Sequence, residues 1–223
     1  MRSPTKRINF DGLVFDINDD VYEPAEDSFL FAENLKVKRG DAVLDLGTGC
    51  GILGILAAKH TARVLAVDLN PYAIQCAKEN ARLNRVLGNI GFIQADLFMP
   101  LKEEVRFDLI TFNAPYLPSE DDEEKTWIGR SWAGGANGRQ VVDRFISQVN
   151  AHLKPQGRVL LMQSTLTDVE ETINQFNQQN LKAQVFAQRK LPFFESLTLI
   201  EATDTSKRNI LGCKHTRYNW RIL

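Results

Sequence analysis

Short apolar runs alternate with longer amphipathic segments over most of the chain. Short apolar runs bounded by glycine, proline or charged residues indicate buried strands. Apolar positions three and four residues apart indicate helices that bury one face. On this basis strands are predicted at Ala42–Leu46, Val64–Val67, Ile90–Gln94, Phe107–Phe112, Arg158–Met162, Val185–Gln188 and Ser196–Ala202, and helices at Ile52–Lys59, Pro71–Asn84, Val141–Leu153 and Val169–Gln179.

The order of these elements predicts the architecture of the sheet. Strands that alternate with helices form a mostly parallel sheet with helices on both faces. The last two strands are joined by a short connection, from about Arg189 to Glu195, which has no room for a crossover helix. These two strands are therefore expected to pair antiparallel. The expected fold is α/β, a doubly wound, mostly parallel seven-stranded sheet with an antiparallel edge strand.

Length and composition are consistent with one globular unit. A chain of 223 residues, 43% hydrophobic and 25% charged, can bury one substantial core. There is no internal repeat and no long linker. Residues 1–223 are therefore expected to form a single domain, with 1–36 as an N-terminal extension that contributes to the ligand site and 204–223 as a basic C-terminal tail.

Several functional classes are disfavoured by the same numbers. No apolar run approaches the roughly 20 residues that span a bilayer, and the polar N-terminus lacks the apolar segment of a signal peptide. The widely spaced cysteines Cys50, Cys76 and Cys213 fit neither a disulfide framework nor a paired-cysteine zinc site, and they suit a reducing cytoplasm. A formal net charge of −1 gives no global case for nucleic-acid binding.

A glycine-rich turn, Asp45–Gly51, follows the first predicted strand. Glycines remove the Cβ atoms that would collide with a ligand, and ligands of open parallel sheets bind beyond the carboxyl ends of the strands. The glycines alone leave two cofactors open. Gly49, Gly51 and Gly54 also fit the G-x-G-x-x-G pattern of dinucleotide-binding proteins.

Acidic residues at the ends of successive strands favour one of these cofactors. Asp45 precedes the first glycine, where a carboxylate would repel a pyrophosphate but attract the ammonium and sulfonium groups of S-adenosylmethionine (SAM). Asp68 ends the second strand and can accept hydrogen bonds from ribose hydroxyls, while Asp96 and Leu97 follow the third and can bracket adenine. Their joint position favours SAM.

The tetrapeptide Asn113-Ala114-Pro115-Tyr116 ends the fourth strand and indicates the chemistry. An amide or amino nitrogen is a poor nucleophile because its lone pair is delocalised, so it needs acceptors for its N–H groups as a methyl group arrives. The asparagine side-chain oxygen and a neighbouring main-chain carbonyl can supply both acceptors. Pro115 favours an extended conformation at Ala114, and Tyr116 offers a flat face for a planar group.

This tetrapeptide resembles the (Asp/Asn/Ser)-Pro-Pro-(Tyr/Phe) motif of amino-methyltransferases that act on adenine, cytosine and glutamine amides, from which it departs at Ala114. Two further segments, Val21–Leu30 and Trp132–Phe145, resemble the archaeal and eukaryotic branch of the HemK/PrmC-like glutamine methyltransferases. The resemblance extends from about Val21 to Thr203.

The resemblance implies a Rossmann-like class I methyltransferase that methylates the glutamine of the Gly-Gly-Gln loop in a class I peptide-release factor. Direct transfer from SAM needs no metal. The residues Asn113, Ala114, Pro115 and Tyr116 would hold the target amide. The cofactor would be contacted by Ser28, Asp45, Gly47, Gly49, Asp68, Asp96, Leu97 and Asn113.

Other functions remain open on the sequence. An adenine-directed nucleic-acid methyltransferase could use the same tetrapeptide, although the near-neutral charge and the lack of a target-recognition domain disfavour it. A SAM-binding partner subunit without catalysis is disfavoured by the intact Asn113 and Tyr116. A dehydrogenase is disfavoured by Asp45 and by the tetrapeptide.

A protein partner is also expected. Many members of this branch work with a small zinc-binding activator protein. The strand at Asn89–Ile93 would lie at a sheet edge in a doubly wound order, and an apolar edge invites another chain to add a strand. The alternative is that the chain's own loops or its basic tail cover this edge.

Overall fold

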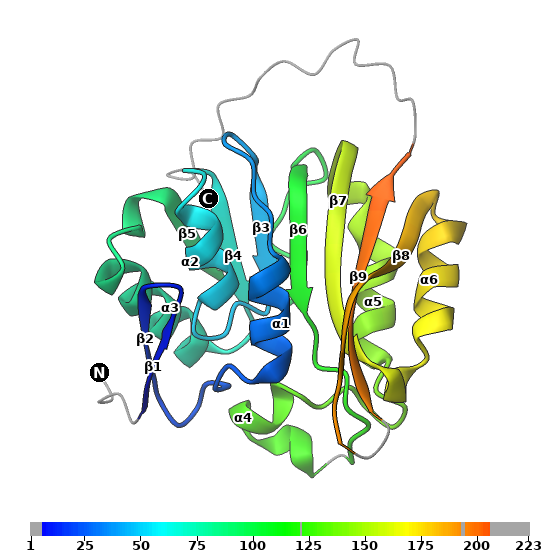
Figure 1. Cartoon of the computed structure of the whole chain (residues 1–223), viewed down its shortest axis with the longest axis horizontal. Coiled ribbons are helices and arrows are strands. Elements are labelled where there is room, and N and C mark those ends of the chain that lie inside the picture. The colour runs from blue at the N-terminus through cyan, green and yellow to red at the C-terminus, as the bar shows by residue number, and fades with distance from the viewer. Residues whose placement is uncertain (1–5, 121, 193–194, 206–223) are drawn as a thin grey trace.

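The computed structural model describes residues 6–120, 122–192 and 195–205. Its centre is a seven-stranded sheet with the order β5-β4-β3-β6-β7-β9-β8 (Figure 1). The strands of this sheet are β3 (Val43–Leu46), β4 (Val64–Asp68), β5 (Ile90–Gln94), β6 (Phe107–Asn113), β7 (Leu153–Ser164), β8 (Leu181–Lys190) and β9 (Ser196–Asp204).

The strands from β5 to β7 run parallel, whereas β9 runs antiparallel to both β7 and β8. The antiparallel strand therefore lies one place in from the edge, between β7 and β8. This confirms the predicted doubly wound α/β fold with an antiparallel pairing at one edge. β8 extends beyond the predicted strand at both ends, because polar residues surround its short apolar run and the run alone marks only the centre of this edge strand.

Helices cover both faces of the sheet (Figure 1). Alternate side chains of β3 enter two separate cores: Val43 packs on one face and Leu44 on the other. The first face carries α1 (Glu26–Asn34), α2 (Ile52–Ala58) and α3 (Pro71–Leu83), and the second carries α5 (Gln140–Val149) and α6 (Val169–Gln178).

The connections at the carboxyl ends of the strands position the ligand site. Asn70 caps α3 as its sequence position predicts, because its side-chain oxygen accepts a hydrogen bond of 2.9 Å from the Tyr72 amide. The cap fixes the turn that follows β4. A short helix, α4 (Trp127–Arg130), lies beyond the same ends of the sheet (Figure 1).

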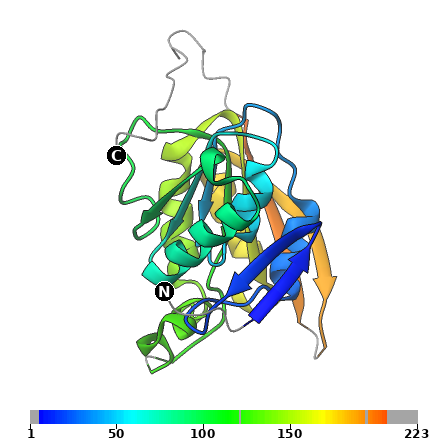
Figure 2. The same ribbon diagram turned by 90° about the vertical axis from the view of Figure 1, so that its left-hand side faces the viewer.

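An antiparallel hairpin of β1 (Lys6–Phe10) and β2 (Leu13–Ile17) packs beside α3, and it is the dark blue pair of strands in Figure 2. The hairpin is not among the elements predicted from the sequence. Two asparagines, one in the last turns of α3 and one that caps its C-terminus, form hydrogen bonds with the outer edge of β2. Asn84 exchanges hydrogen bonds with the backbone of Val14, and Asn80 does the same with Asp16. These side-chain amides act as a substitute for a neighbouring strand.

Among the described residues, no helix combines the length and hydrophobicity needed to cross a membrane. The basic run of the predicted C-terminal tail, from Lys207 to Arg221, lies outside the described residues. The third cysteine, Cys213, also lies outside them, while Cys50 and Cys76 are buried free thiols.

Candidate active site

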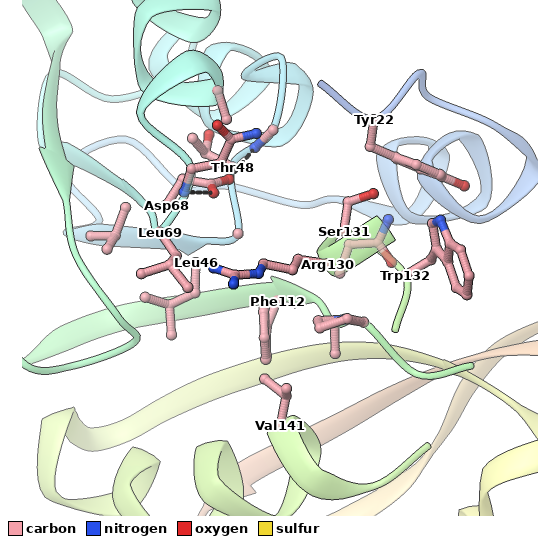
Figure 3. A pocket seen from close by; sticks show the side chains of 18 of the residues that line it. Tyr22, Leu46, Thr48, Asp68, Leu69, Phe112, Arg130, Ser131, Trp132 and Val141 are labelled. Carbon is pink, nitrogen blue, oxygen red and sulfur yellow. Dashed lines mark hydrogen bonds between the residues drawn. The ribbon is translucent and has the colours of Figure 1, made fainter. Parts of the chain in front are cut away.

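A cavity of about 620 Å³ opens at the carboxyl ends of β3, β4 and β6, with α1 and α4 contributing to its walls (Figure 3). Figure 3 shows Asp68 and Thr48 on one side of this space, Tyr22 and Trp132 on the other, and Arg130 extending between them. All but one of the residues predicted from the sequence line it: Ser28, Gly47, Gly49, Asp68, Asp96, Leu97, Asn113, Ala114, Pro115 and Tyr116.

The glycine turn needs glycine for two reasons. Gly47 and Gly49 have positive φ angles of 61° and 56°, which side chains rarely adopt. A Cβ atom on Gly47 would lie 3.1 Å from the Phe112 ring, whereas one on Gly49 would meet nothing within 4 Å. Gly47 is thus required for packing as well as conformation, and the open space beside Gly49 lies on the cavity wall.

Asp68 holds the glycine turn while keeping acceptor capacity. One of its oxygens accepts from the Gly49 amide at 2.9 Å and the other from the Asn70 amide at 2.9 Å. Burial raises the pKa of Asp68 above its ordinary value, although these backbone donors act in the opposite direction. Each carboxylate oxygen can accept more than one hydrogen bond, so Asp68 can still bind ligand hydroxyls.

Asp45 occupies a different place from the one expected. Its side chain is 1% exposed and does not line the cavity. One oxygen accepts from the Thr48 hydroxyl at 2.6 Å and the Gly54 amide at 3.0 Å, and the other accepts from the Thr111 hydroxyl at 2.9 Å. The structure therefore shows this carboxylate beneath the glycine turn, tying it to α2 and β6.

The end of β6 meets the start of α1 at a buried carboxylate that sequence analysis missed. Asp27 is 6% exposed and accepts a hydrogen bond of 3.1 Å from the Asn113 side-chain nitrogen. The Tyr116 hydroxyl lies 3.4 Å from the same oxygen, and the Tyr22 hydroxyl lies 3.2 Å from the other. The Ser28 amide donates to that second oxygen at 2.6 Å.

The two tyrosines at this carboxylate are donors. Burial raises the pKa of the Tyr22 and Tyr116 hydroxyls, and the negative charge of Asp27 raises both pKa values further. Both phenols therefore remain protonated over the physiological range. Tyr116 contributes a planar wall and a hydrogen-bond donor rather than a general base.

The Trp132–Phe145 segment supports the tetrapeptide loop directly. The backbone of Leu117 pairs with Trp132 and Gly134 on either side of an isolated bridge to Ala133, through hydrogen bonds of 2.9 and 2.8 Å. A Cβ atom on Gly138 would lie 2.3 Å from the Tyr116 carbonyl oxygen. The glycines of this segment thus allow two loops to pack closely and fix the chain that follows Asn113.

Asp96 and Leu97 follow β5 and also line the cavity. One Asp96 oxygen accepts from the Arg144 guanidinium at 2.6 Å in a partly exposed ion pair. Leu97 is buried with a positive φ of 46°, an unusual conformation for this residue type. Within residues 6–120, 122–192 and 195–205, no three His, Cys, Asp or Glu side chains gather as a metal site would require.

Comparison with known proteins gives the class first. The family model of the methyltransferase small domain matches residues 24–129, which include the glycine turn and the tetrapeptide. Together with the sheet order and the cavity at its carboxyl ends, this makes the chain a class I methyltransferase. S-adenosylmethionine is bound in a solved structure of the same fold, the 16S rRNA N2 G1207 methyltransferase of T. thermophilus, which is 19% identical with a TM-score of 0.64.

Individual relatives then give the family. A provisionally named protein N5-glutamine methyltransferase of Methanocaldococcus jannaschii is 42% identical over 197 residues, which are 87% of this chain and 98% of the relative. Human methyltransferase HEMK2 is 34% identical over 165 residues, 69% of this chain and 76% of the relative. The chain belongs to the family of protein N5-glutamine methyltransferases, as its sequence motifs implied.

A solved structure extends the comparison. It contains the Mtq2–Trm112 complex of E. cuniculi, which is described as responsible for methylation of the translation termination factor eRF1. One chain of that complex matches with a TM-score of 0.61 and 25% identity, over 83% of this chain and 99% of that one.

Proposed function

We propose that this enzyme methylates the side-chain nitrogen of the glutamine in the Gly-Gly-Gln loop of a class I peptide-release factor. One observation supports a carboxamide substrate most directly. The side-chain oxygen of Asn113, a residue of the cavity wall, is buried and has no hydrogen-bond donor in the described part of the chain. An unpaired buried acceptor costs about 1–3 kcal/mol, so a bound N–H group would stabilise the site. The target of the E. cuniculi complex supports the choice of a release factor.

The site acts on the amide by accepting its protons. Bound SAM supplies a methyl group on a positively charged sulfur. The Asn113 side-chain oxygen and the Ala114 carbonyl accept the two N–H groups of the glutamine amide, which returns electron density to its nitrogen. The nitrogen–methyl bond forms as the sulfur–methyl bond breaks, and one amide proton passes to water. Alignment and fixed acceptors thus replace a strong base.

The cavity fits the cofactor in size and in chemistry. Its volume of about 620 Å³ lies within the range of roughly 300–1,000 Å³ for sites that enclose small ligands. Asp68 accepts from the ribose hydroxyls, Asp96 and Leu97 bracket the adenine, and the Gly47–Gly49 turn allows close approach. Ser28 reaches the same space from α1. Asp45 acts indirectly, by holding the turn in shape.

The main rival function is methylation of an adenine amino group, which would use the same acceptors. A single assay separates the two: the enzyme is given labelled SAM together with a release factor and an adenine-containing oligonucleotide. Label is expected on the release factor alone and is expected to be absent with Asn113→Ala, because this residue supplies an acceptor. Label on the oligonucleotide but not on the release factor would overturn the proposal.

We also propose a small zinc-binding activator protein as a partner that adds a strand to β5. Within the described residues β5 pairs only with β4, so no strand pairs with its other edge. Phe92 and Ile93 are only partly buried on this edge strand. An apolar edge strand of this kind is stabilised when another chain extends the sheet.

A pair of variants tests this partner. Phe92→Glu places a charge on β5 and is expected to abolish co-elution with the co-expressed activator in size-exclusion chromatography. Val185→Glu is the matched control, since Val185 is 46% exposed on β8 at the opposite edge. Its complex should remain intact. Equal binding by both variants, or a fully active chain that forms no complex, would contradict the proposal.

A further inference from the structure

The buried carboxylate of Asp27 lies within hydrogen-bond distance of the residue that holds the substrate amide. One Asp27 oxygen accepts from the Asn113 side-chain nitrogen at 3.1 Å. The Ser28 hydroxyl lies 3.3 Å from the same nitrogen. The Asn113 nitrogen is therefore engaged on the α1 side, and the oxygen of the same side chain is the atom left without a donor.

We infer that Asp27 is a positioning residue that sets the orientation of the Asn113 amide. This inference rests on the proposed function, because the orientation matters only if Asn113 accepts from the substrate. An ionised carboxylate has acceptors only, so it stabilises the orientation in which the Asn113 nitrogen faces it. The reverse orientation would place two acceptors against each other and present a donor to the substrate N–H groups.

The surroundings of Asp27 favour this role over that of an ordinary ion-pair partner. Among the described residues it makes no salt bridge with a Lys, Arg or His side chain. It is held instead by neutral donors: the Ser28 amide and the Tyr22 and Tyr116 hydroxyls. A buried carboxylate that accepts hydrogen bonds from several fixed donors cannot rotate freely. It can therefore fix the orientation of the Asn113 side-chain amide.

Three variants distinguish positioning from general structural support. In Asp27→Asn the side-chain oxygen is expected to remain with the Ser28 amide donor, so the new NH₂ group faces the Asn113 nitrogen. The kcat should then fall by about 100-fold, the scale for losing one transition-state hydrogen bond. The affinity of Asp27→Asn for SAM should stay within about threefold of that of the unsubstituted protein. Asn113→Asp alone places two carboxylates next to each other, and its kcat should also fall.

The exchange of both residues is the decisive variant. In Asp27→Asn with Asn113→Asp, the new amide donates to the new carboxylate, whose other oxygen again faces the substrate as an acceptor. The kcat of this double variant should exceed that of Asp27→Asn by at least about tenfold. A purely structural role for Asp27 predicts no such recovery. An unchanged kcat in Asp27→Asn would overturn the inference. So would a folded double variant whose kcat does not exceed that of Asp27→Asn.

A measurement without substrate separates this inference from the proposed function. In the unsubstituted protein, the side-chain NH₂ protons of Asn113 should exchange slowly with water in ¹⁵N-resolved NMR, because they are hydrogen-bonded to Asp27. The signal is assigned by its loss in Asn113→Ala. Exchange as fast as that of surface asparagines would overturn the inference even if the variants do not fold. Slow exchange without methylation of a release factor would instead count against the proposed substrate alone.

Discussion

At the residue scale, Asp45 shows how a carboxylate can shape a ligand site from beneath it. Its strand position indicates an acidic group near the cofactor, and the structure places it close by but facing away from the cavity. The direction of a side chain at a strand end depends on neighbouring strands. One partner, Thr111, lies 66 residues away in the sequence. The position of Asp45 could therefore be predicted, but its contacts could not.

The buried position of Asp45 predicts a pH-dependent stability. Burial raises its pKa to about 6 from the ordinary value of 3.8, so the folded state binds a proton more tightly than the unfolded state. The free energy of unfolding should therefore gain about 1 kcal/mol from this residue as the pH falls from about 7 to about 5. Above pH 6 this contribution is lost.

Urea unfolding of the unsubstituted chain and of Asp45→Asn at both pH values isolates this effect, since the other titrating groups are shared. The difference in free energy of unfolding between the two proteins should change by about 1 kcal/mol between about pH 7 and about pH 5. A difference that is the same at both pH values would show that Asp45 does not titrate in this range.

Asp27 was missed for a related reason. It is separated from Asn113 by 86 residues, and nothing in the local sequence pairs them. The neighbouring Ser28 and the tetrapeptide were both recognised from their motifs, and only the packing of α1 on the sheet shows that they meet.

At the element scale, most strands and helices followed from hydrophobic periodicity. Helices α1 and α4 were not predicted, and the N-terminal hairpin was the main omission. Its signal was present: Asp11-Gly12 is a strong hairpin dipeptide, and both residues have positive φ angles. The alternation of buried and partly buried residues in β2 also fits a strand. What the sequence could not show is that Asn80 of α3 and Asn84, the residue that caps this helix, would form hydrogen bonds with this edge.

That asparagine pair leads to a stability prediction. The Asn80 side chain binds the Asp16 backbone twice and also donates to the Cys50 carbonyl in the glycine turn at 2.9 Å. Asn80→Ala should lower the free energy of unfolding by about 1–3 kcal/mol, because it leaves buried backbone groups unpaired. It should also weaken SAM binding, since the turn loses a support.

The control is Gln75→Ala on the exposed side of the same helix, where the Gln75 side chain donates a 3.2 Å hydrogen bond to Glu79. This variant should unfold within about 0.5 kcal/mol of the unsubstituted chain. Chemical denaturation and calorimetry with SAM give both readouts. Equal stability of the two variants would show that Asn80 does not join the hairpin to the core.

At the scale of the whole molecule, the strand order explains why one cavity collects residues from most of the chain. The parallel strands β4, β3 and β6 present their carboxyl ends to the same side, so Asp68, the glycine turn and Asn113 converge there. This convergence could be predicted from the order of elements. The contributions of α1 and of the Trp132–Phe145 segment could be expected only from family resemblance, because no periodicity shows that they reach the cavity.

Transfer of a methyl group to a glutamine side chain is the reaction proposed for this cavity. Tandem mass spectrometry of a release factor incubated with the enzyme and SAM tests it most directly. One added methyl group is expected on the side chain of the Gly-Gly-Gln glutamine. None should appear when that glutamine is replaced by alanine or when the enzyme carries Asn113→Ala. A methyl group on another residue, or an unmodified release factor after incubation with the enzyme and its activator, would contradict it.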